Sequence, residues 1–382
     1  MGMDFHENAA GFREGRMAFS PVTLFDVSRQ RVGTAGQVDL PENGFPKRMD
    51  RGSRLAFLAA KEALAQAGLS GIGMPMIVGT SAAAMPIGED YYRAAVSGLE
   101  KRSTQLVRVE TYQAHRQITD MARLTGVDGH IRIVSNACAS GANAIGQAFH
   151  LIRSGRADRV IAGGYDALCQ LVFAGFDTLQ ALSPSGIPRP FDAARDGLAL
   201  GEGAGFVVVE SAVSAKSRGA RVIAEITGYG AATDVHHLTQ PHPEGDAALV
   251  TMHAACDMAG ISPAQIDYIN SHGTGTPLND VAEGNAIRRW AGDAVSSIRV
   301  SSTKPAIGHL LGGAGAVESV ICLIALENQF LPASLNVREA DPVCEFDLVR
   351  EPRASRVERV LTNSFGFGGA NATLVFEKEG LA

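Results

Sequence analysis

The sequence has few cysteines and no excess of positive charge, and each shortage argues against a class of protein. Its five cysteines are Cys138, Cys169, Cys256, Cys322 and Cys344. They are widely spaced and contain no C-x-x-C pair, so we expect neither a disulfide framework nor a zinc site, and we expect a reducing, cytoplasmic environment. The net charge of −6 argues against a general nucleic-acid binder.

Long hydrophobic runs and nucleotide-binding loops are also missing. No apolar run reaches the ~18 residues of a membrane span, and residues 1–16 contain acidic side chains rather than the apolar core of an export signal. We therefore expect no membrane span. The sequence has no Walker motif and no G-x-G-x-x-G, which leaves a dinucleotide site weakly supported. His236, His237 and His242 lie close together, but their spacing matches no familiar metal site, so we expect no metal.

The residues that are present favour a large α/β protein. The chain has 382 residues, is 46% hydrophobic and contains 43 glycines, which suits two domains or one duplicated domain with many tight turns. Strand and helix patterns alternate throughout, and residues 221–226 open what looks like a second half. The expected strands are 74–79, 131–134, 159–162, 206–209 and 266–269, the expected helices are 54–67, 138–152, 246–259, 281–290 and 314–326, and residues 360–363 and 372–376 form a closing hairpin.

Cys138 is the first candidate for chemistry. It lies where an expected strand turns into a helix rich in small residues. The positive end of the helix dipole and the unpaired N–H groups there favour the thiolate, which is the nucleophilic form, and could stabilise an oxyanion. From spacing alone, a buried and inert cysteine is an equally good interpretation.

Two histidines lie on glycine-rich loops. His272 follows an expected strand in the segment NSHGTGTP, and His309 precedes an apolar helix in the segment KPAIGHLLGG. Lys304 and Glu318 flank His309 and could set its charge and orientation if both face it. An ordinary turn histidine and a surface ion pair, which contributes little, are the alternatives.

Five segments together resemble the elongating β-ketoacyl carrier-protein synthases of the thiolase superfamily. The resemblance runs from about residue 45 to residue 376 and is specific because the segments occur in this order. They are residues 135–141 (SNACASG), 189–205 (RPFDAARDGLALGEGAG), 270–277 (NSHGTGTP), 301–318 (SSTKPAIGHLLGGAGAVE) and 363–371 (NSFGFGGAN). The chain keeps the Cys-His-His set rather than the second cysteine of degradative thiolases or the His-Asn pair of starter-type synthases.

The resemblance implies a fold, a reaction and a site. The fold would be a five-layer α-β-α-β-α sandwich of two similar halves, 1–215 and 216–382, usually a homodimer, with a heterodimer possible. Cys138 would hold the acyl chain, His272 and His309 would assist decarboxylation of a malonyl thioester, and Lys304 with Glu318 would support them. The remaining implied residues are Phe367 and Phe365 at the oxyanion hole and gate, Thr274 and Thr276 on the pantetheine arm, and Phe176 in the acyl pocket. No cofactor is implied beyond the pantetheine arm that an acyl carrier protein brings.

The chain departs from the family pattern at its beginning. The strand and glycine loop with which the family normally starts are not found, so the first sheet would lack an internal strand. Docking of an acidic carrier protein needs a basic patch on this acidic chain, and Lys47, Arg48 and Arg51 are the candidates.

Two other functions remain open. A non-catalytic partner could shape the tunnel of another synthase subunit. A cysteine hydrolase or acyltransferase could use Cys138 with one histidine. The sequence leaves the acyl chain length and the pathway (fatty acid, polyketide or polyene) undetermined.

Overall fold

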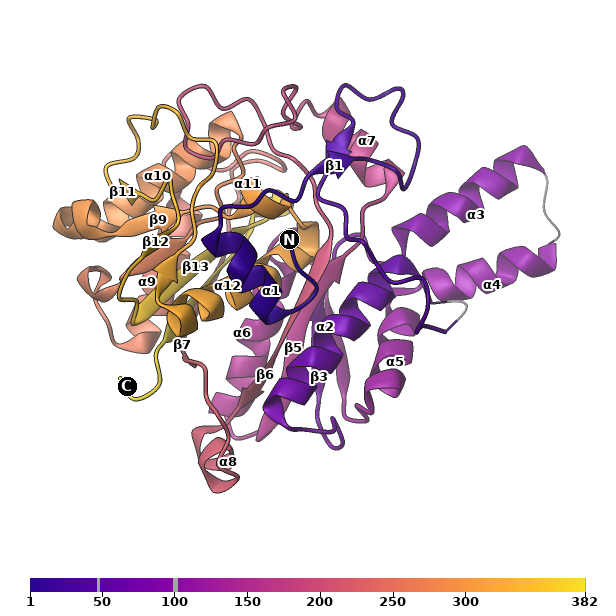
Figure 1. The fold of residues 1–382 in the computed structure, drawn as a ribbon, viewed down its shortest axis with the longest axis horizontal. Helices are drawn as coiled ribbons and strands as arrows, with labels where there is room; N and C mark the ends of the chain where they lie inside the picture. Colours follow the sequence, from indigo (N-terminus) through magenta and orange to yellow (C-terminus); the bar gives the residue numbers. More distant parts are fainter. Residues whose placement is uncertain (47–48, 99–101, 382) are drawn as a thin grey trace.

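The computed structural model describes residues 1–46, 49–98 and 102–381 as two sheets with helices between and around them (Figure 1). The first sheet has the strand order β4-β3-β5-β6 and the second has the order β11-β9-β8-β13-β14-β7. The strands of the first sheet are β3 (Met76–Gly79), β4 (Ile131–Val134), β5 (Arg159–Asp166) and β6 (Gly203–Glu210). Those of the second are β7 (Glu225–Thr233), β8 (Tyr268–Asn270), β9 (Arg299–Ser301), β11 (Asp347–Leu348), β13 (Arg359–Phe365) and β14 (Ala370–Glu377).

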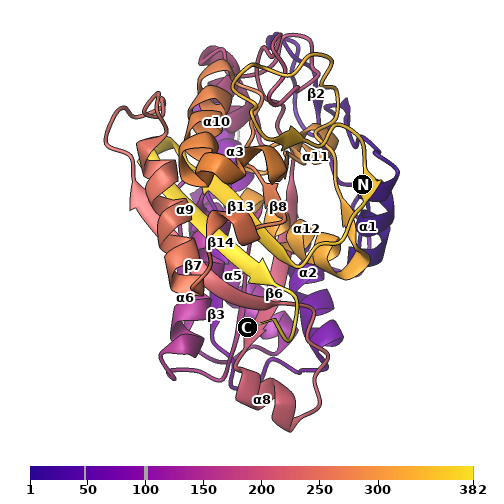
Figure 2. The same cartoon turned by 90° about the vertical axis from the view of Figure 1, so that its left-hand side faces the viewer.

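Layers of helices alternate with the two sheets, which gives five layers in all (Figures 1 and 2). Helices α6 (Ser140–Arg153) and α12 (Ala314–Asn328) lie between the two sheets and contact both. Helices α2 (Arg51–Ala67) and α5 (Ala114–Thr125) cover the outer face of the first sheet, and α9 (Asp246–Ala259) and α10 (Pro277–Ala291) cover that of the second. The expected α-β-α-β-α sandwich is therefore confirmed. The largest apolar cluster lies around α6 and α12, where both sheets supply side chains.

The remaining elements decorate these layers. The helices are α1 (Phe5–Arg13), α3 (Met85–Ser97), α4 (Arg102–Tyr112), α7 (Gln170–Thr178), α8 (Ala212–Ser217) and α11 (Lys304–Ile307). The short strands pair as β1 (Ser20–Pro21) with β2 (Thr34–Ala35) and β10 (Phe330–Leu331) with β12 (Arg353–Ala354). Helices α3 and α4 form an arm that projects from the body (Figure 1). The boundary expected at residue 215 falls inside α8, and the chain crosses from one sheet to the other between residues 210 and 225.

Several elements differ in extent from the sequence prediction. The strand expected over 159–162 continues to Asp166, because the two glycines that follow stay paired with both β3 and β6. The helix expected from Cys138 begins at Ser140, since the chain first makes a tight turn. Residues 311–328 are long and apolar enough to cross a membrane by composition alone, yet 72% of that window is buried inside the protein. Most of this window is α12, one of the two helices at the centre of the sandwich.

The two sheets differ at one edge. In the second sheet β14 is paired on both sides, with β13 and with β7. In the first sheet β6 pairs with β5, and its other edge has no strand partner among the residues that the structure describes. A cavity of about 880 Å³ lies against that edge, between α2, α12 and the N-terminal residues 1–12.

Candidate active site

A strained turn presents Cys138 between β4 and α6. Ala137 has a φ of +54°, a conformation that side chains other than glycine rarely adopt. Its carbonyl accepts hydrogen bonds from the hydroxyls of Ser140, at 2.6 Å, and Ser81, at 2.8 Å. These contacts hold the turn. Cys138 itself is buried.

Burial, rather than the helix end, governs the resting charge of Cys138. Loss of hydration raises the pKa of its thiol to about 12, against the opposing effects of the Lys304 ammonium and a hydrogen bond from the Phe367 N–H. Burial thus opposes the stabilisation of the thiolate that the sequence leads us to expect from the helix end. Desolvation of a charged sulfur outweighs a nearby partial charge, and the thiol is the resting form.

A buried carboxylate anchors the backbone around His272. The N–H groups of His272 and Gly273 donate to the two oxygens of Glu283, at 2.8 and 2.7 Å, and the Asn363 side chain donates to the same carboxylate at 3.1 Å. Burial raises the pKa of Glu283 to about 7. Sequence reasoning missed this residue. A charged side chain on the buried face of the helix expected over 281–290 was the available signal.

His309 lies beside His272. Its backbone N–H donates to the Ala199 carbonyl at 2.7 Å, and its backbone carbonyl accepts from the Gly201 N–H at 3.0 Å. The two imidazole rings are 5.3 Å apart and nearly perpendicular. Burial first, and then the Lys304 charge, hold the pKa of both rings well below the ordinary value. Both histidines are therefore neutral at pH 7.

Lys304 and Glu318 form a buried ion pair rather than a surface pair. Each side chain is 2% exposed. The Lys304 ammonium also donates to the His272 carbonyl and lies 3.4 Å from His272 Nδ1. An ammonium has only donors, so Nδ1 accepts and the proton of the neutral ring is on Nε2.

Three aromatic rings line the same cavity as Cys138. Phe367, which is 40% exposed, stacks on Phe176 at a ring distance of 5.7 Å. Phe365 lies 5.5 Å from the His272 ring. The structure therefore brings all three aromatic residues expected from the sequence to one place.

A cavity of about 420 Å³ connects these groups. Cys138, His272, His309, Phe176, Phe365 and Phe367 line it together with Thr274 and Thr276. The two threonine hydroxyls are 2.9 Å apart. The cavity thus contains a thiol, two neutral imidazoles and a pair of hydroxyls on walls supplied by both halves of the chain.

Asp166 is a second buried carboxylate that sequence reasoning missed. It accepts from the Thr80 hydroxyl at 2.6 Å, from the N–H groups of residues 81–83, and from Gly312 N–H at 2.7 Å. It therefore ties the loop after β3 to the start of α12. The end of β5, where it lies, was not predicted as strand.

The expected docking patch is only partly described. Lys47 and Arg48 lie outside the described residues. Arg51 forms an ion pair with the buried carboxylate of Glu202 and donates to the Val38 carbonyl. The Arg51 guanidinium is thus engaged with a buried acid, and its part in docking stays a prediction.

The histidine cluster forms no recognisable metal site. Asp234 accepts from the backbone N–H groups of His236 and His242, which makes it a loop-forming residue. Within residues 1–46, 49–98 and 102–381, no group of three or more His, Cys, Asp or Glu side chains could hold a metal ion.

Comparison with known proteins identifies the family. The model described as "Beta-ketoacyl synthase, N-terminal domain" matches residues 19–215, and "Beta-ketoacyl synthase, C-terminal domain" matches residues 223–338. The 3-oxoacyl-[acyl-carrier-protein] synthase 2 of a Synechocystis species is 38% identical over 96% of this chain and 92% of its own, and that of Staphylococcus aureus is 35% identical over the same shares.

Solved structures agree with this assignment. The ishigamide ketosynthase/chain length factor is 35% identical with a TM-score of 0.92, covering 98% of this chain and 95% of its own. A beta-ketoacyl synthase from Burkholderia phymatum is 33% identical with a TM-score of 0.86 and the same coverage. With both halves of the fold, the ordered motifs and these relatives in agreement, the chain belongs to the beta-ketoacyl synthase family.

Proposed function

We propose that this protein joins an acyl group held on Cys138 to a malonyl group carried by an acyl carrier protein, with loss of carbon dioxide. The product is a 3-oxoacyl group on the carrier protein. The observation that carries the proposal is the shared cavity of Cys138, His272 and His309, in which both imidazoles are neutral. No cofactor of the enzyme's own is needed, because the pantetheine arm arrives on the carrier protein.

The first step loads the enzyme. The Cys138 thiol loses its proton and its sulfur attacks the carbonyl of an acyl thioester, and the carrier thiol leaves with a proton. The N–H groups of Cys138 and Phe367 face the developing oxyanion, as preorganised donors in a dry site should. Because the thiol has a raised pKa, its sulfur loses the proton only as it attacks the thioester, and that proton goes to the departing carrier thiol.

The second step forms the carbon–carbon bond. The bond between the malonyl carboxylate and the neighbouring carbon breaks, carbon dioxide leaves, and the electron pair forms an enolate at the thioester oxygen. His272 donates its Nε2–H to that oxygen, and His309 supplies the second donor. The enolate carbon attacks the acyl carbonyl on Cys138, and the sulfur leaves as a thiolate that takes up a proton from the solvent. A carboxylate here would repel the enolate.

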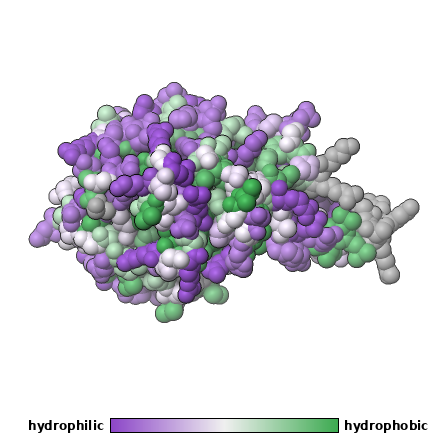
Figure 3. Space-filling model, turned by 90° about the horizontal axis from the view of Figure 1, so that it is seen from below, coloured by the Kyte–Doolittle hydropathy of each residue, from purple (hydrophilic) through white to green (hydrophobic). Residues whose placement is uncertain are grey.

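A second copy of this chain is the proposed structural partner. Large apolar side chains on the α3–α4 arm are exposed, among them Tyr92, Val96 and Leu106, at about 70% each. Figure 3 shows hydrophobic residues gathered at the end of the molecule that carries this arm. Monomers rarely expose such a surface. A related subunit is the alternative occupant, since one similar solved structure is a ketosynthase in complex with its chain length factor. Light scattering of the purified chain separates a dimer from a monomer that needs another subunit.

A non-catalytic role beside another synthase subunit is the second candidate. The structural likeness to a ketosynthase/chain length factor pair favours it. The retained nucleophile and histidine pair favour catalysis.

We also propose a cytoplasmic location, which the five free cysteines support.

Carrier-protein docking has its own test. Reversing Lys47 and Arg48 to Glu should raise the KM for the carrier protein with little change in kcat, because rim charges act on association. An unchanged KM would remove both residues from the docking surface.

Intact-protein mass spectrometry tests the proposed function itself. The wild-type chain and its Cys138→Ala variant are incubated with acyl-loaded carrier proteins of several lengths, with Cys169→Ala as the matched control for a second buried cysteine. We expect an acyl mass gain in wild type and in Cys169→Ala and none in Cys138→Ala, and a 3-oxoacyl carrier protein once malonyl carrier protein is added. No mass gain from a folded wild-type chain would favour the non-catalytic role, and release of free acid would favour a hydrolase.

A further inference from the structure

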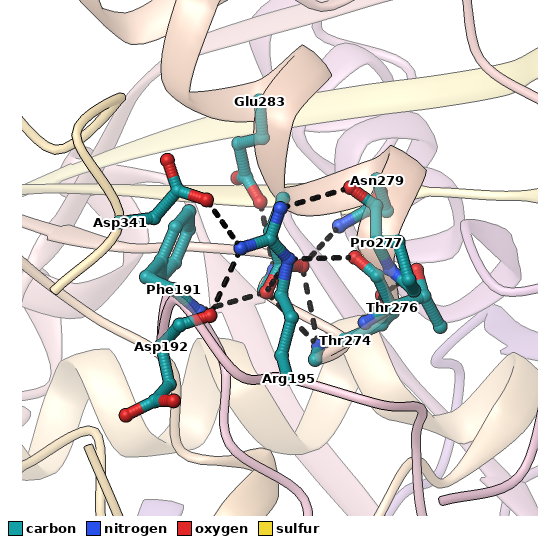
Figure 4. A network of polar contacts seen from close by, with 12 residues as sticks. Phe191, Asp192, Arg195, Thr274, Thr276, Pro277, Asn279, Glu283 and Asp341 are labelled. Carbon is teal, nitrogen blue, oxygen red and sulfur yellow. Dashed lines mark hydrogen bonds and ion pairs between the residues drawn. The ribbon is translucent and has the colours of Figure 1, made fainter. Parts of the chain in front are cut away.

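Arg195 is a buried cation that lies outside the cavity and contacts one of its walls from behind. Its side chain is 6% exposed. It comes from the turn after residue 191 and reaches the loop that connects His272 to α10. Figure 4 shows the guanidinium between Asp341 on one side and the Thr276–Pro277 backbone on the other.

The contacts of Arg195 are directed at backbone carbonyls of that loop. Its Nε donates to the Thr276 carbonyl at 3.2 Å and its Nη2 to the Pro277 carbonyl at 3.0 Å. Its Nη1 donates to Asp341 at 2.6 Å and to the Asp192 carbonyl at 2.9 Å. A planar guanidinium with donors in a fixed fork suits this arrangement, whereas a lysine could not make all of these bonds at once.

Arg195 also lies near Asp280, which holds the same loop from the helix side. The Asp280 carboxylate is fully buried and 3.9 Å from Arg195 Nε. It accepts from the N–H of Gly275, at 3.2 Å, and of Phe191, at 2.8 Å. Gly275 has a φ of +80°, which glycine adopts without strain, and Phe191 has a φ of +62°, which is strained for a phenylalanine. The Asp280 carboxylate thus joins the 274–277 loop to the strained turn from which Arg195 comes. Burial raises the pKa of Asp280 and the Arg195 charge opposes that rise.

We propose that Arg195 is a positioning residue that fixes the 274–277 loop so that the Thr274 and Thr276 hydroxyls meet the pantetheine arm. The inference rests on the proposed function, in which that arm enters the cavity. The two hydroxyls bond each other at 2.9 Å and line the cavity from a loop whose carbonyls Arg195 holds. Arg195 therefore acts on binding of the arm, while His272 keeps its own anchor in Glu283 and the chemistry of decarboxylation is spared.

Arg189 provides a matched control within the same segment. It is also a partly buried arginine paired with an aspartate, Asp196, and it donates to the Ser185 hydroxyl. Its side chain makes these bonds away from the 274–277 carbonyls. A loss of general stability in this segment should therefore affect both arginines, and a loss of loop position only Arg195.

The test compares Arg195→Gln, Arg195→Lys and Arg189→Gln with wild type. Steady-state condensation is measured with malonyl carrier protein and with the malonyl thioester of N-acetylcysteamine, a short mimic that lacks most of the arm. We expect Arg195→Gln to raise the KM for malonyl carrier protein about tenfold, which is the loss of one or two hydrogen bonds to the arm. We expect kcat to stay within about threefold of wild type, the KM for the short mimic to be unchanged, and Arg189→Gln to resemble wild type.

Each result decides between the possibilities. An Arg195→Gln enzyme with wild-type KM overturns the inference, and so does a fall in kcat at unchanged KM, which would place the effect on the chemistry. If Arg195→Gln does not fold, Arg195→Lys keeps the charge without the fork and must show the same KM rise on the carrier protein alone. A folded wild-type chain with no condensing activity would overturn the proposed function and this inference with it, whereas an active wild type with unaltered variants overturns only the inference.

Discussion

Lys304 and Glu318 bring opposite charges together where each side chain is only 2% exposed. Taking two ions out of water is costly, and removing one partner leaves the other charge buried and unpaired. The same ammonium orients the His272 ring through its Nδ1. The pair therefore connects the stability of the core to the proton arrangement of the active site.

Replacing one partner of this ion pair should destabilise the fold more than replacing both. We expect Lys304→Met to lower the free energy of unfolding by about 3–5 kcal/mol, because Glu318 is left without its partner. The double variant Lys304→Met/Glu318→Met should recover most of that loss, while its activity stays well below that of wild type. Urea unfolding followed by fluorescence or circular dichroism measures the free energy of unfolding of the single and the double variant. Equal losses in the single and double variants would show that the two side chains are not coupled.

The two histidines should be separable from the nucleophile. We expect His272→Ala and His309→Ala each to lower malonyl decarboxylation by about 10²–10³, the usual cost of one missing oxyanion donor, while Cys138 is still acylated by an acyl carrier protein. Radiolabelled carbon dioxide release measures the first reaction and intact mass the second. His253→Ala, on α9 and away from the cavity, is the control. Loss of acylation at the same rate as decarboxylation would contradict the assigned roles.

The histidine pair also sets an acid limit for decarboxylation. The folded-state pKa of each ring lies well below the ordinary 6.5, so both rings stay neutral, and activity should hold as the pH falls from 7 through 6.5. Stability has the opposite tendency. Below pH 6.5 the histidines of the unfolded chain bind protons, whereas the two buried rings of the folded protein stay neutral. The free energy of unfolding therefore falls as the pH falls.

Lys304 supplies part of that low pKa. In the Lys304→Met/Glu318→Met variant the acid limb of any residual decarboxylation should move to higher pH, toward 6.5, because the neighbouring positive charge is gone. The pH profile of carbon dioxide release checks this. A wild-type acid limb centred at 6.5 or above would mean that the rings are not desolvated as the structure has them.

The Phe176–Phe367 stack should control access to Cys138. Such a contact contributes about 0.5–1.5 kcal/mol, so Phe367→Ala should raise the population of the open gate by up to about tenfold. We expect faster labelling of Cys138 by a bulky maleimide. Phe149→Ala, which removes a half-buried ring on α6 outside the cavity lining, serves as the control. Unchanged labelling in Phe367→Ala would exclude a gate at this position.

The unpaired edge of β6 should show in hydrogen exchange. Amides of β6 that point away from β5 have no strand partner among the described residues, whereas β14 is paired on both sides. We expect those β6 amides to exchange ~10-fold or more faster than the amides of β14. Equal protection would mean that a further segment or another subunit covers the edge, in keeping with the first strand that the family pattern leads us to expect.

The sequence by itself determined the fold class, the order of the motifs and the residues that gather in the cavity. Cys138, His272 and His309 each follow a strand or precede a helix in segments rich in small residues, and such local patterns survive in one dimension. The alternation of strands and helices indicated an α/β protein, and the resemblance to the condensing enzymes supplied the five-layer sandwich.

Only the tertiary structure decided the charges and their partners. The resting thiol of Cys138, the neutral histidines and the pKa of Glu283 near 7 follow from burial, which depends on segments more than a hundred residues apart. Arg51 looked like a surface charge and is paired with Glu202, 151 residues away. Arg195 holds a loop 81 residues further along the chain. Desolvation and long-range pairing are properties of the packed core, so the sequence names the candidate residues, and the fold sets their protonation and position.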